Sequence, residues 1–187
     1  MLTTSQLYRH QIYTMTTQHS IILVLCIFNV PFYQGREETE NHLERRQISI
    51  IDVKCRKVPG FQVYKEGSTR MCLHHGQNFI TYTEAKSYCA SIGSRLAVFN
   101  TRDKFKIVLP MNNVWIGLDD METEGTYKWA DGSTLEQSLI SFIFYPNEPN
   151  AAYDDEDCVC NNCYENFLKL VDMPCYRNFT YLCEKVF

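Results

Sequence analysis

The cysteines of this chain constrain its fold more than any other feature. The sequence has 187 residues and nine cysteines. One of them, Cys26, lies in an N-terminal apolar segment, and the remaining eight lie from Cys55 to Cys183. An even number of cysteines is typical of a disulfide framework formed in an oxidising compartment. Eight cysteines allow many complete pairings, so their spacing alone does not assign the partners.

The N-terminal segment has the pattern of a targeting signal. Residues 21–28 are an unbroken apolar run, and no acidic residue precedes Glu37. The run is shorter than the roughly 20 residues that span a bilayer. We therefore predict a cleaved signal peptide at residues 1–35, with a signal anchor as the alternative. Cleavage would leave a secreted, extracellular chain with no stable membrane span, and it would remove Cys26.

Charge and local composition narrow the class of partner. The formal net charge is −4, which argues against nucleic acid because phosphate binding requires a basic surface. Residues 36–52 are predicted to be a charged linker, and their densely charged part, 36–47, is too short to supply coiled-coil heptads. The oligomeric state is therefore left open. Asn178-Phe179-Thr180 is an N-glycosylation acceptor, which agrees with secretion.

The pattern of apolar residues predicts an α+β domain over residues 53–187. One helix begins at the capping box Thr81–Glu84 and ends near Gly93, and a second runs from a cap at Asn100 or Thr101 to Leu109. Short strands are predicted at residues 48–53, 61–64, 96–99, 114–118, 167–171 and 179–183. Residues 130–157 show few strand signals, and a loop of this length in a compact domain is usually functional.

Five short motifs occur along the chain. Each is common by itself, but their order and spacing together are specific to one kind of domain. They are Trp115-Ile116-Gly117-Leu118, Tyr127-Lys128-Trp129, Glu148-Pro149-Asn150, Glu156-Asp157-Cys158 and Tyr181-Leu182-Cys183-Glu184. In this order they resemble the calcium-dependent carbohydrate-recognition domain of C-type lectins, and the resemblance covers residues 53–187. It implies the double-loop fold of that family, with two helices, small antiparallel sheets and a long loop pinned by a disulfide.

The resemblance also implies disulfide pairs. They are Cys89 with Cys183, which closes the ends of the domain, Cys158 with Cys175, which pins the long loop, and Cys55 with Cys72, an extra N-terminal pair. Cys160 and Cys163 have no counterpart in the family. They can pair with each other, or one of them can bond to another chain. A zinc site formed by Cys158, Cys160, Cys163 and Cys175 is a further alternative.

A calcium ion at the sugar site is the central functional implication of the resemblance. Its ligands would be Glu148, Asn150, Glu156 and Asp172, together with the residue before Asp172. Glu148, Asn150 and Glu156 would also hydrogen-bond two neighbouring sugar hydroxyls, since carboxylates accept and amide N–H groups donate. The Glu-Pro-Asn order implies sugars with equatorial 3- and 4-hydroxyls, namely mannose and N-acetylglucosamine, and fucose by analogous geometry.

Two positions depart from the family pattern. Val171 stands where the family has an asparagine, so one calcium ligand and one hydrogen bond to the sugar are missing. A second calcium site would match Asp120, Glu124, Glu156 and Asp157. Its usual aspartate after the Glu-Pro-Asn triplet is replaced by Ala151. For Asp120 and Glu124, an ordinary polar turn is the alternative interpretation.

The leading hypothesis is therefore a secreted lectin that binds mannose-type glycans or glycoproteins through calcium. The alternative is a calcium-independent domain of the same fold that binds a protein or another ligand, and Val171 and Ala151 motivate it. No nucleophile with an adjacent base and no phosphate-binding loop is evident, so we do not predict an enzyme. The aromatic residues Trp115, Tyr127 and Trp129 are predicted to lie in the core, and His74 and His75 on the surface.

Overall fold

The structure is a computed structural model that describes residues 49–150, 155–163 and 168–187. The described elements all belong to one compact unit, Ile48–Phe187. The predicted signal peptide and the linker up to residue 48 lie outside the described residues. None of the helices in the described part combines the length and the apolar character that crossing a membrane requires.

The described residues form four helices and eight strands in an α+β arrangement. The helices are α2 (Ile50–Cys55), α3 (Tyr82–Ser91), α4 (Arg102–Val108) and α5 (Gln137–Ile143). The strands are β1 (Gln62–Glu66), β2 (Thr69–Ile80), β3 (Arg95–Leu96), β4 (Val114–Asp119), β5 (Lys128–Trp129), β6 (Cys158–Asn161), β7 (Leu170–Met173) and β8 (Phe179–Lys185).

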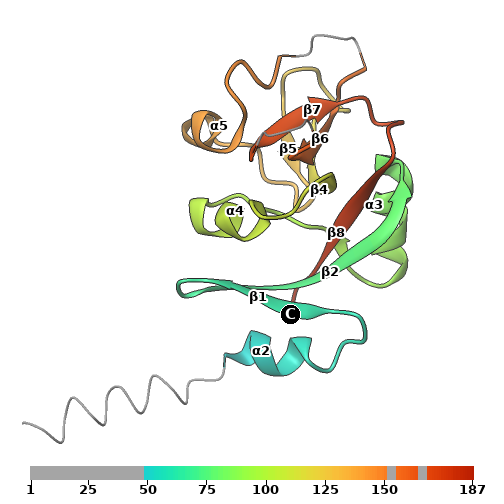
Figure 1. The fold of residues 1–187 in the computed structure, drawn as a ribbon, viewed down its shortest axis with the longest axis vertical. Helices are drawn as coiled ribbons and strands as arrows, with labels where there is room; N and C mark the ends of the chain where they lie inside the picture. The colour runs from blue at the N-terminus through green and yellow to red at the C-terminus, as the bar shows by residue number, and fades with distance from the viewer. Residues whose placement is uncertain (1–48, 151–154, 164–167) are drawn as a thin grey trace, which may run out of the picture. The chain divides into compact units, whose positions relative to one another are not determined.

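The strands join into a single sheet whose order is β1-β2-β8-β4-β6-β7, with β3 beside β8 and β5 beside β4. Every pairing is antiparallel except that of β4 with β8, which is parallel. Figure 1 shows β8 between the β1–β2 hairpin and the β4–β7 region, with α4 and α5 on one side of the strands and α3 on the other. The small antiparallel sheets that the sequence predicted are thus connected through one parallel pair.

The two predicted helices begin where their caps indicate. Thr81 accepts from the backbone N–H of Glu84, whose side chain in turn accepts from the backbone N–H of Thr81, which completes the capping box of α3. The Thr101 hydroxyl caps α4 by accepting from the backbone N–H of Lys104. Helix α5, by contrast, lies in a region that was predicted to be irregular, and its N-cap residue makes no side-chain cap hydrogen bond.

The strand predicted at residues 48–53 is wrong, because this segment begins helix α2. The Ser49 hydroxyl caps the helix by accepting from the backbone N–H of Ile51. Asp52 is buried and forms ion pairs with Lys65 at 3.3 Å and Arg70 at 3.6 Å. These interactions place Asp52 and Cys55 on the inner side of a helix, and the folded unit therefore begins before residue 53.

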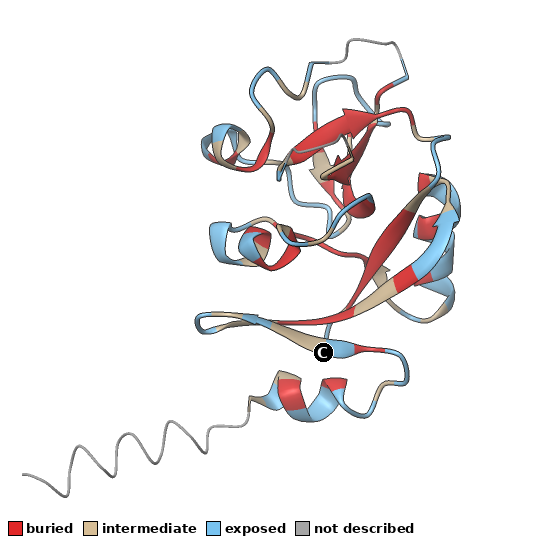
Figure 2. Ribbon diagram, in the orientation of Figure 1, coloured by how far each residue is buried: buried red, intermediate tan, exposed pale blue. Residues whose placement is uncertain are grey.

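The core consists of two groups of buried side chains. Figure 2 shows that most of the central strands consist of buried residues. Tyr127 and Trp129 belong to one group and Trp115 to the other, so the prediction that these three residues lie in the core is confirmed. His74 and His75 are half-buried, not fully on the surface. The His74 ring stacks on Tyr88 with ring centroids 6.0 Å apart.

The cysteines pair as the resemblance implied. Cys89 is bonded to Cys183, Cys158 to Cys175 and Cys55 to Cys72. Cys160 and Cys163, for which two possibilities were open, are bonded to each other. The zinc alternative is wrong, because it requires thiolates and all four of its cysteines are in disulfides.

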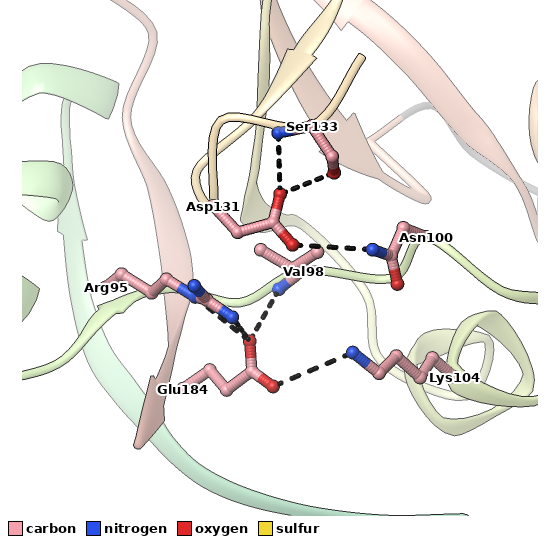
Figure 3. Close-up of polar contacts among 7 residues, drawn as sticks. All are labelled: Arg95, Val98, Asn100, Lys104, Asp131, Ser133 and Glu184. Atoms are coloured by element: carbon pink, nitrogen blue, oxygen red, sulfur yellow. Dashed lines mark hydrogen bonds and ion pairs between the residues drawn. The ribbon is translucent and has the colours of Figure 1, made fainter. Parts of the chain in front are cut away.

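An ion-pair network around the buried Glu184 connects β8 to the middle of the domain (Figure 3). Glu184, in β8, accepts hydrogen bonds from the Arg95 guanidinium at 3.3 Å and from the backbone N–H of Val98 at 3.3 Å. Lys104 of α4 lies 4.0 Å from its other oxygen. Beside it, Asp131 accepts from Asn100 and from Ser133. The network joins β8, β3 and α4.

Candidate functional site

The four predicted calcium ligands come from three segments of the chain. Glu148 and Asn150 follow α5, where the Glu148–Pro149 peptide bond is cis. Glu156 precedes β6, and Asp172 lies within β7, opposite Val159 of β6. Asp172 is 2% exposed and Glu156 is also buried, whereas Glu148 is half-buried and Asn150 is exposed. The site is therefore open on the side of the Glu-Pro-Asn triplet.

Hydrogen bonds connect these residues directly. The backbone N–H of Asn150 donates to Asp172 Oδ2 at 3.1 Å, and the Asn150 side-chain amide donates to Glu148 Oε2 at 2.8 Å. The Tyr127 hydroxyl donates to Asp172 Oδ2 at 3.4 Å. Asp172 is thus fixed by a loop on one side and by a buried aromatic residue on the other.

The carboxylates of the site repel one another. Burial raises the pKa of Glu148 to about 8, with further contributions from a hydrogen bond to Asp172 and from the negative charges of Asp172 and Glu156. A carboxyl group retains its proton at neutral pH only where the ionised form is strongly disfavoured. An added cation would relieve this repulsion, so the charge distribution of the site suits a bound cation.

Val171 contributes nothing to such a cation through its side chain. It precedes Asp172 in β7, it is fully buried, and it packs in the core group that contains Trp115 and Cys158. The sequence interpretation of this position as a missing ligand agrees with that placement. Ala151, the second departure from the family pattern, lies outside the described residues.

Asp120 is the centre of the predicted second calcium site. It is 2% exposed, and its Oδ2 accepts from the backbone N–H of Gly125 at 2.8 Å. Its Oδ1 is buried and has no hydrogen-bond partner within the described part of the chain. Burial raises the pKa of Asp120 to about 6, and the charges of Glu124 and Asp157 add to the shift. An orphaned buried carboxylate oxygen beside two further acids is compatible with a cation ligand.

Tyr127 lies between the two groups of acids, a role that sequence reasoning did not identify. Burial raises its pKa above the ordinary range, and the charges of Asp172 and Asp120 contribute further. A buried tyrosine hydroxyl usually finds a hydrogen-bond partner, but the sequence does not say which one. The structure identifies that partner as Asp172.

The donor set fits calcium in chemistry, because carboxylate and amide oxygens are the ligands that this hard cation prefers. Within residues 49–150, 155–163 and 168–187, no group of three or more His, Cys, Asp or Glu side chains is already arranged to hold a metal. The Asn150 side-chain amide donates to the Glu148 carboxylate, so this hydrogen bond would be replaced when both side chains coordinate a cation.

A cavity of about 590 Å³ adjoins the Glu-Pro-Asn triplet. Its lining includes Ile140, Ser141, Phe144, Tyr145, Glu148 and Lys169. Glu148 therefore belongs both to the predicted calcium site and to this cavity. Asn178, the predicted glycosylation site, is exposed in the segment just before β8.

Comparison with known proteins identifies relatives of this domain. Residues 79–185 match the model of the family described as Lectin C-type domain. The chain is 32% identical over 115 residues to C-type lectin lectoxin-Enh4 of Pseudoferania polylepis, a match that covers 56% of this chain and 70% of that protein. It is 29% identical over 118 residues to human C-type lectin domain family 17, member A, covering 61% of this chain but only 29% of that protein.

Solved structures share the fold at low sequence identity. The carbohydrate-recognition domain of cow CD23, determined in the presence of a GlcNAc2Man3 oligosaccharide, aligns with a TM-score of 0.57 and 22% identity over 69% of this chain and 95% of that one. A calcium-independent type II antifreeze protein aligns with a TM-score of 0.56 and 19% identity over 68% of this chain and 92% of that one.

These structural likenesses establish the double-loop fold and leave the ligand to be argued from the site. The family model matches more than half of the chain, and the fold that the motifs implied is confirmed. This chain belongs to the C-type lectin domain family.

Proposed function

We propose that this protein is a secreted lectin that binds mannose-type glycans, carrying mannose, N-acetylglucosamine or fucose, through a calcium ion. The observation that supports the proposal is the hydrogen-bonded group of Glu148, Asn150 and Asp172, in which Asn150 donates to both acids. Burial raises the pKa of Glu148 to about 8, and the hydrogen bond to Asp172 and the charges of Asp172 and Glu156 add to the shift. A cation bound beside these acids would offset their negative charge and so favour their ionised forms.

In this proposal the side chains of the site have two roles, which are to coordinate the calcium ion and to hydrogen-bond the sugar. Glu148, Asn150, Glu156 and Asp172 would hold the calcium ion, which supplies coordination positions for two neighbouring sugar hydroxyls. The carboxylates of Glu148 and Glu156 accept hydrogen bonds from those hydroxyls, and the amide of Asn150 donates one. Tyr127 and the backbone N–H of Asn150 keep Asp172 in place.

Val171 weakens this site in the proposal. It offers neither a ligand oxygen nor an amide donor, and a hydrogen bond to a charged group contributes about 1.5–3 kcal/mol. The affinity for a single sugar is therefore expected to be at least tenfold below that of a site with the complete ligand set. Binding to glycans that present several copies of the sugar would compensate through avidity.

Retention on immobilised mannose tests the proposal directly. The domain from Arg36 to Phe187 is applied in calcium and then washed with a chelator. Retention in calcium and release by the chelator are the expected outcome. Melting temperatures measured with and without calcium on the same sample report cation binding independently of any sugar. If the melting temperature does not respond to calcium at millimolar concentrations, the proposal is wrong.

A calcium-independent binding domain is the second candidate, and the burial of Val171 in the core favours it. The likeness to a calcium-independent antifreeze protein is compatible with this candidate at the level of fold. It requires that a chelator change neither the melting temperature nor the binding of the ligand. The calcium titration described above therefore separates the two candidates.

The wider setting of the protein forms part of the same proposal. Secretion, removal of residues 1–35, N-glycosylation at Asn178 and a glycan or glycoprotein partner are mutually consistent. We further propose that the domain binds its partner without catalysing a reaction and does not bind nucleic acid. Mass spectrometry of the secreted protein would establish both the mature N-terminus and the occupancy of Asn178.

A further inference from the structure

The cavity beside Glu148 contains a lysine that the calcium site does not use. Lys169 immediately precedes β7 and lies three residues before Asp172. It lines the cavity together with residues of α5 and the segment that leads to Glu148. Among the described residues that line the cavity, Lys169 is the only Lys, Arg or His. It therefore gives a positive group to a cavity whose lining also includes Glu148, a residue of the proposed sugar site.

Lys169 is held at both its backbone and its side chain. Its carbonyl accepts from the backbone N–H of Asn162 at 3.0 Å. The carbonyl of the next residue, Leu170, accepts from the backbone N–H of Tyr145 at 2.9 Å, which fixes the start of β7 against the cavity wall. The ammonium group of Lys169 donates to the carbonyl of Ser141 in α5 at 3.1 Å. This bond uses one of the three donor positions of an ammonium group and leaves two for a ligand.

The remaining lining suits a carbohydrate. The half-buried Ile140 supplies apolar surface, Tyr145 an aromatic ring, and Gln137 and Asn147 side-chain amides, while the buried Phe144 forms the floor. Sugars bind in sites that combine an aromatic or apolar surface with a few polar groups that fix their orientation. The cavity is a depression open to solvent, and its volume of about 590 Å³ is large enough for one sugar unit.

We propose that this cavity is a subsite for a sugar that carries an acidic group, either a sulfate ester or a carboxylate, with Lys169 as the residue that binds the acid. This inference rests on the proposed lectin function, because the acidic sugar would be the neighbour of the one bound at Glu148 and Asn150. Lys169 thereby selects acidic glycans over neutral ones that present the same mannose-type terminus.

The test compares three mannose-containing disaccharides, one neutral, one sulfated and one containing a uronic acid. Their dissociation constants are measured in calcium for the wild type, Lys169→Gln and the control Lys57→Gln. Lys57 is exposed on the loop after α2, away from the lining of the cavity. The wild type is expected to bind at least one acidic disaccharide about fivefold more tightly than the neutral one, the order of one charge-assisted hydrogen bond at a partly exposed site.

Lys169→Gln is expected to abolish this preference while neutral binding stays unchanged, and Lys57→Gln is expected to leave both as in the wild type. The preference of the wild type should also weaken in higher salt. Equal losses for neutral and acidic ligands, together with a lower melting temperature, would mean that Lys169 only stabilises the end of α5, and would overturn the inference.

The result for the neutral ligand separates the inference from the function on which it rests. If the wild type binds the neutral disaccharide in calcium but shows no preference for an acidic one, the inference is overturned and the lectin function stands. If it binds none of the three in calcium and its melting temperature is insensitive to calcium, the proposed function fails and the inference fails with it.

Discussion

At the scale of single residues, Asp172 accepts from the Asn150 backbone and the Tyr127 hydroxyl and lies beside Glu148. Asp172→Asn keeps the shape of the side chain and removes one charge from the acidic group. We expect the calcium-induced rise in melting temperature to disappear. In chelator at neutral pH, the variant should be no more stable than the wild type, because Glu148, with its pKa raised to about 8, then donates to a neutral amide oxygen instead of a carboxylate.

The control for Asp172→Asn is Asp103→Asn, which removes the same charge from the exposed surface of α4. Differential scanning calorimetry with calcium and with chelator measures both effects. A full calcium response in Asp172→Asn would show that this carboxylate is not a ligand, and the site would have to be assigned elsewhere.

Tyr127 acts on the site only through its hydroxyl, which makes the substitution Tyr127→Phe informative. The ring remains packed against Phe144, with ring centroids 5.9 Å apart in the wild type, while the bond to Asp172 is lost. We expect the unfolding free energy in chelator to fall by about 1 kcal/mol, the usual value of one hydrogen bond. The calcium concentration at half-saturation should rise a few-fold, because Asp172 is held less firmly.

The matched control is Tyr176→Phe, since the Tyr176 side chain is well exposed. Urea denaturation and a calcium titration followed by intrinsic fluorescence provide the two readouts. If Tyr127→Phe leaves calcium affinity at the wild-type value, the hydroxyl has a structural role only.

At the scale of elements, Glu184 holds β8, β3 and α4 together (Figure 3). Glu184→Gln retains a hydrogen-bond acceptor but removes the charge that pairs with Arg95 and Lys104. Glu184 is buried while Arg95 and Lys104 are partly exposed, so the change removes a charge-assisted hydrogen bond and the partner of two half-buried cations. We expect the unfolding free energy to fall by about 2 kcal/mol.

Glu136→Gln makes the same chemical change at an exposed position and should alter stability little. Urea denaturation of the two variants gives the comparison. Because β4 and β6 separate β8 from β7 in the sheet, the calcium response of Glu184→Gln should match that of the wild type. A stability equal to that of Glu136→Gln would show that the network contributes nothing.

The elements also show how far the sequence could be interpreted. Helices α3 and α4 were predictable because their starts depend on local caps, the hydroxyls of Thr81 and Thr101. Helix α2 also starts at a local cap, Ser49, but it was predicted as a strand, because its inner face is defined by distant partners, Lys65 and Arg70 for Asp52. Helix α5 has no capping signal, and its apolar residues are equally compatible with an irregular loop that packs on the core.

The candidate site likewise contains residues whose role was predictable from the sequence and residues whose role was not. The acids were predictable from the resemblance, because the Glu-Pro-Asn triplet and the spacing from Asp172 to Cys175 are visible in one chain. The contact of Tyr127 with Asp172 was not, since it joins residues from β-strand regions far apart in the sequence. Lys169 could not be predicted to line a cavity, because helix α5, which contributes other residues of the lining, was not predicted.

At the scale of the whole molecule, the disulfides differ in how much chain they close. Cys89–Cys183 spans 94 residues, Cys55–Cys72 and Cys158–Cys175 each span 17, and Cys160–Cys163 spans 3. In the chain-entropy model, a cross-link stabilises the fold by restricting the unfolded chain, and the effect grows with the logarithm of the loop length. The longest loop should therefore contribute most and the shortest least.

We expect the double substitution Cys89→Ser with Cys183→Ser to lower the unfolding free energy by about 4–5 kcal/mol, and the corresponding change at Cys55 and Cys72 by about 3 kcal/mol. The change at Cys160 and Cys163 should cost the least, because a short ring restricts the unfolded chain little. Urea denaturation in chelator gives this order free of any contribution from calcium. Both cysteines of a pair are replaced, so that no free thiol can exchange with the remaining disulfides. If removing the Cys160–Cys163 disulfide lowered the unfolding free energy as much as removing Cys89–Cys183, the entropy of the unfolded chain could not explain the effect. The disulfide would then stabilise the folded state, in which the backbone N–H of Asn162 donates to the Lys169 carbonyl and the Asn162 carbonyl accepts from the backbone N–H of Asn113.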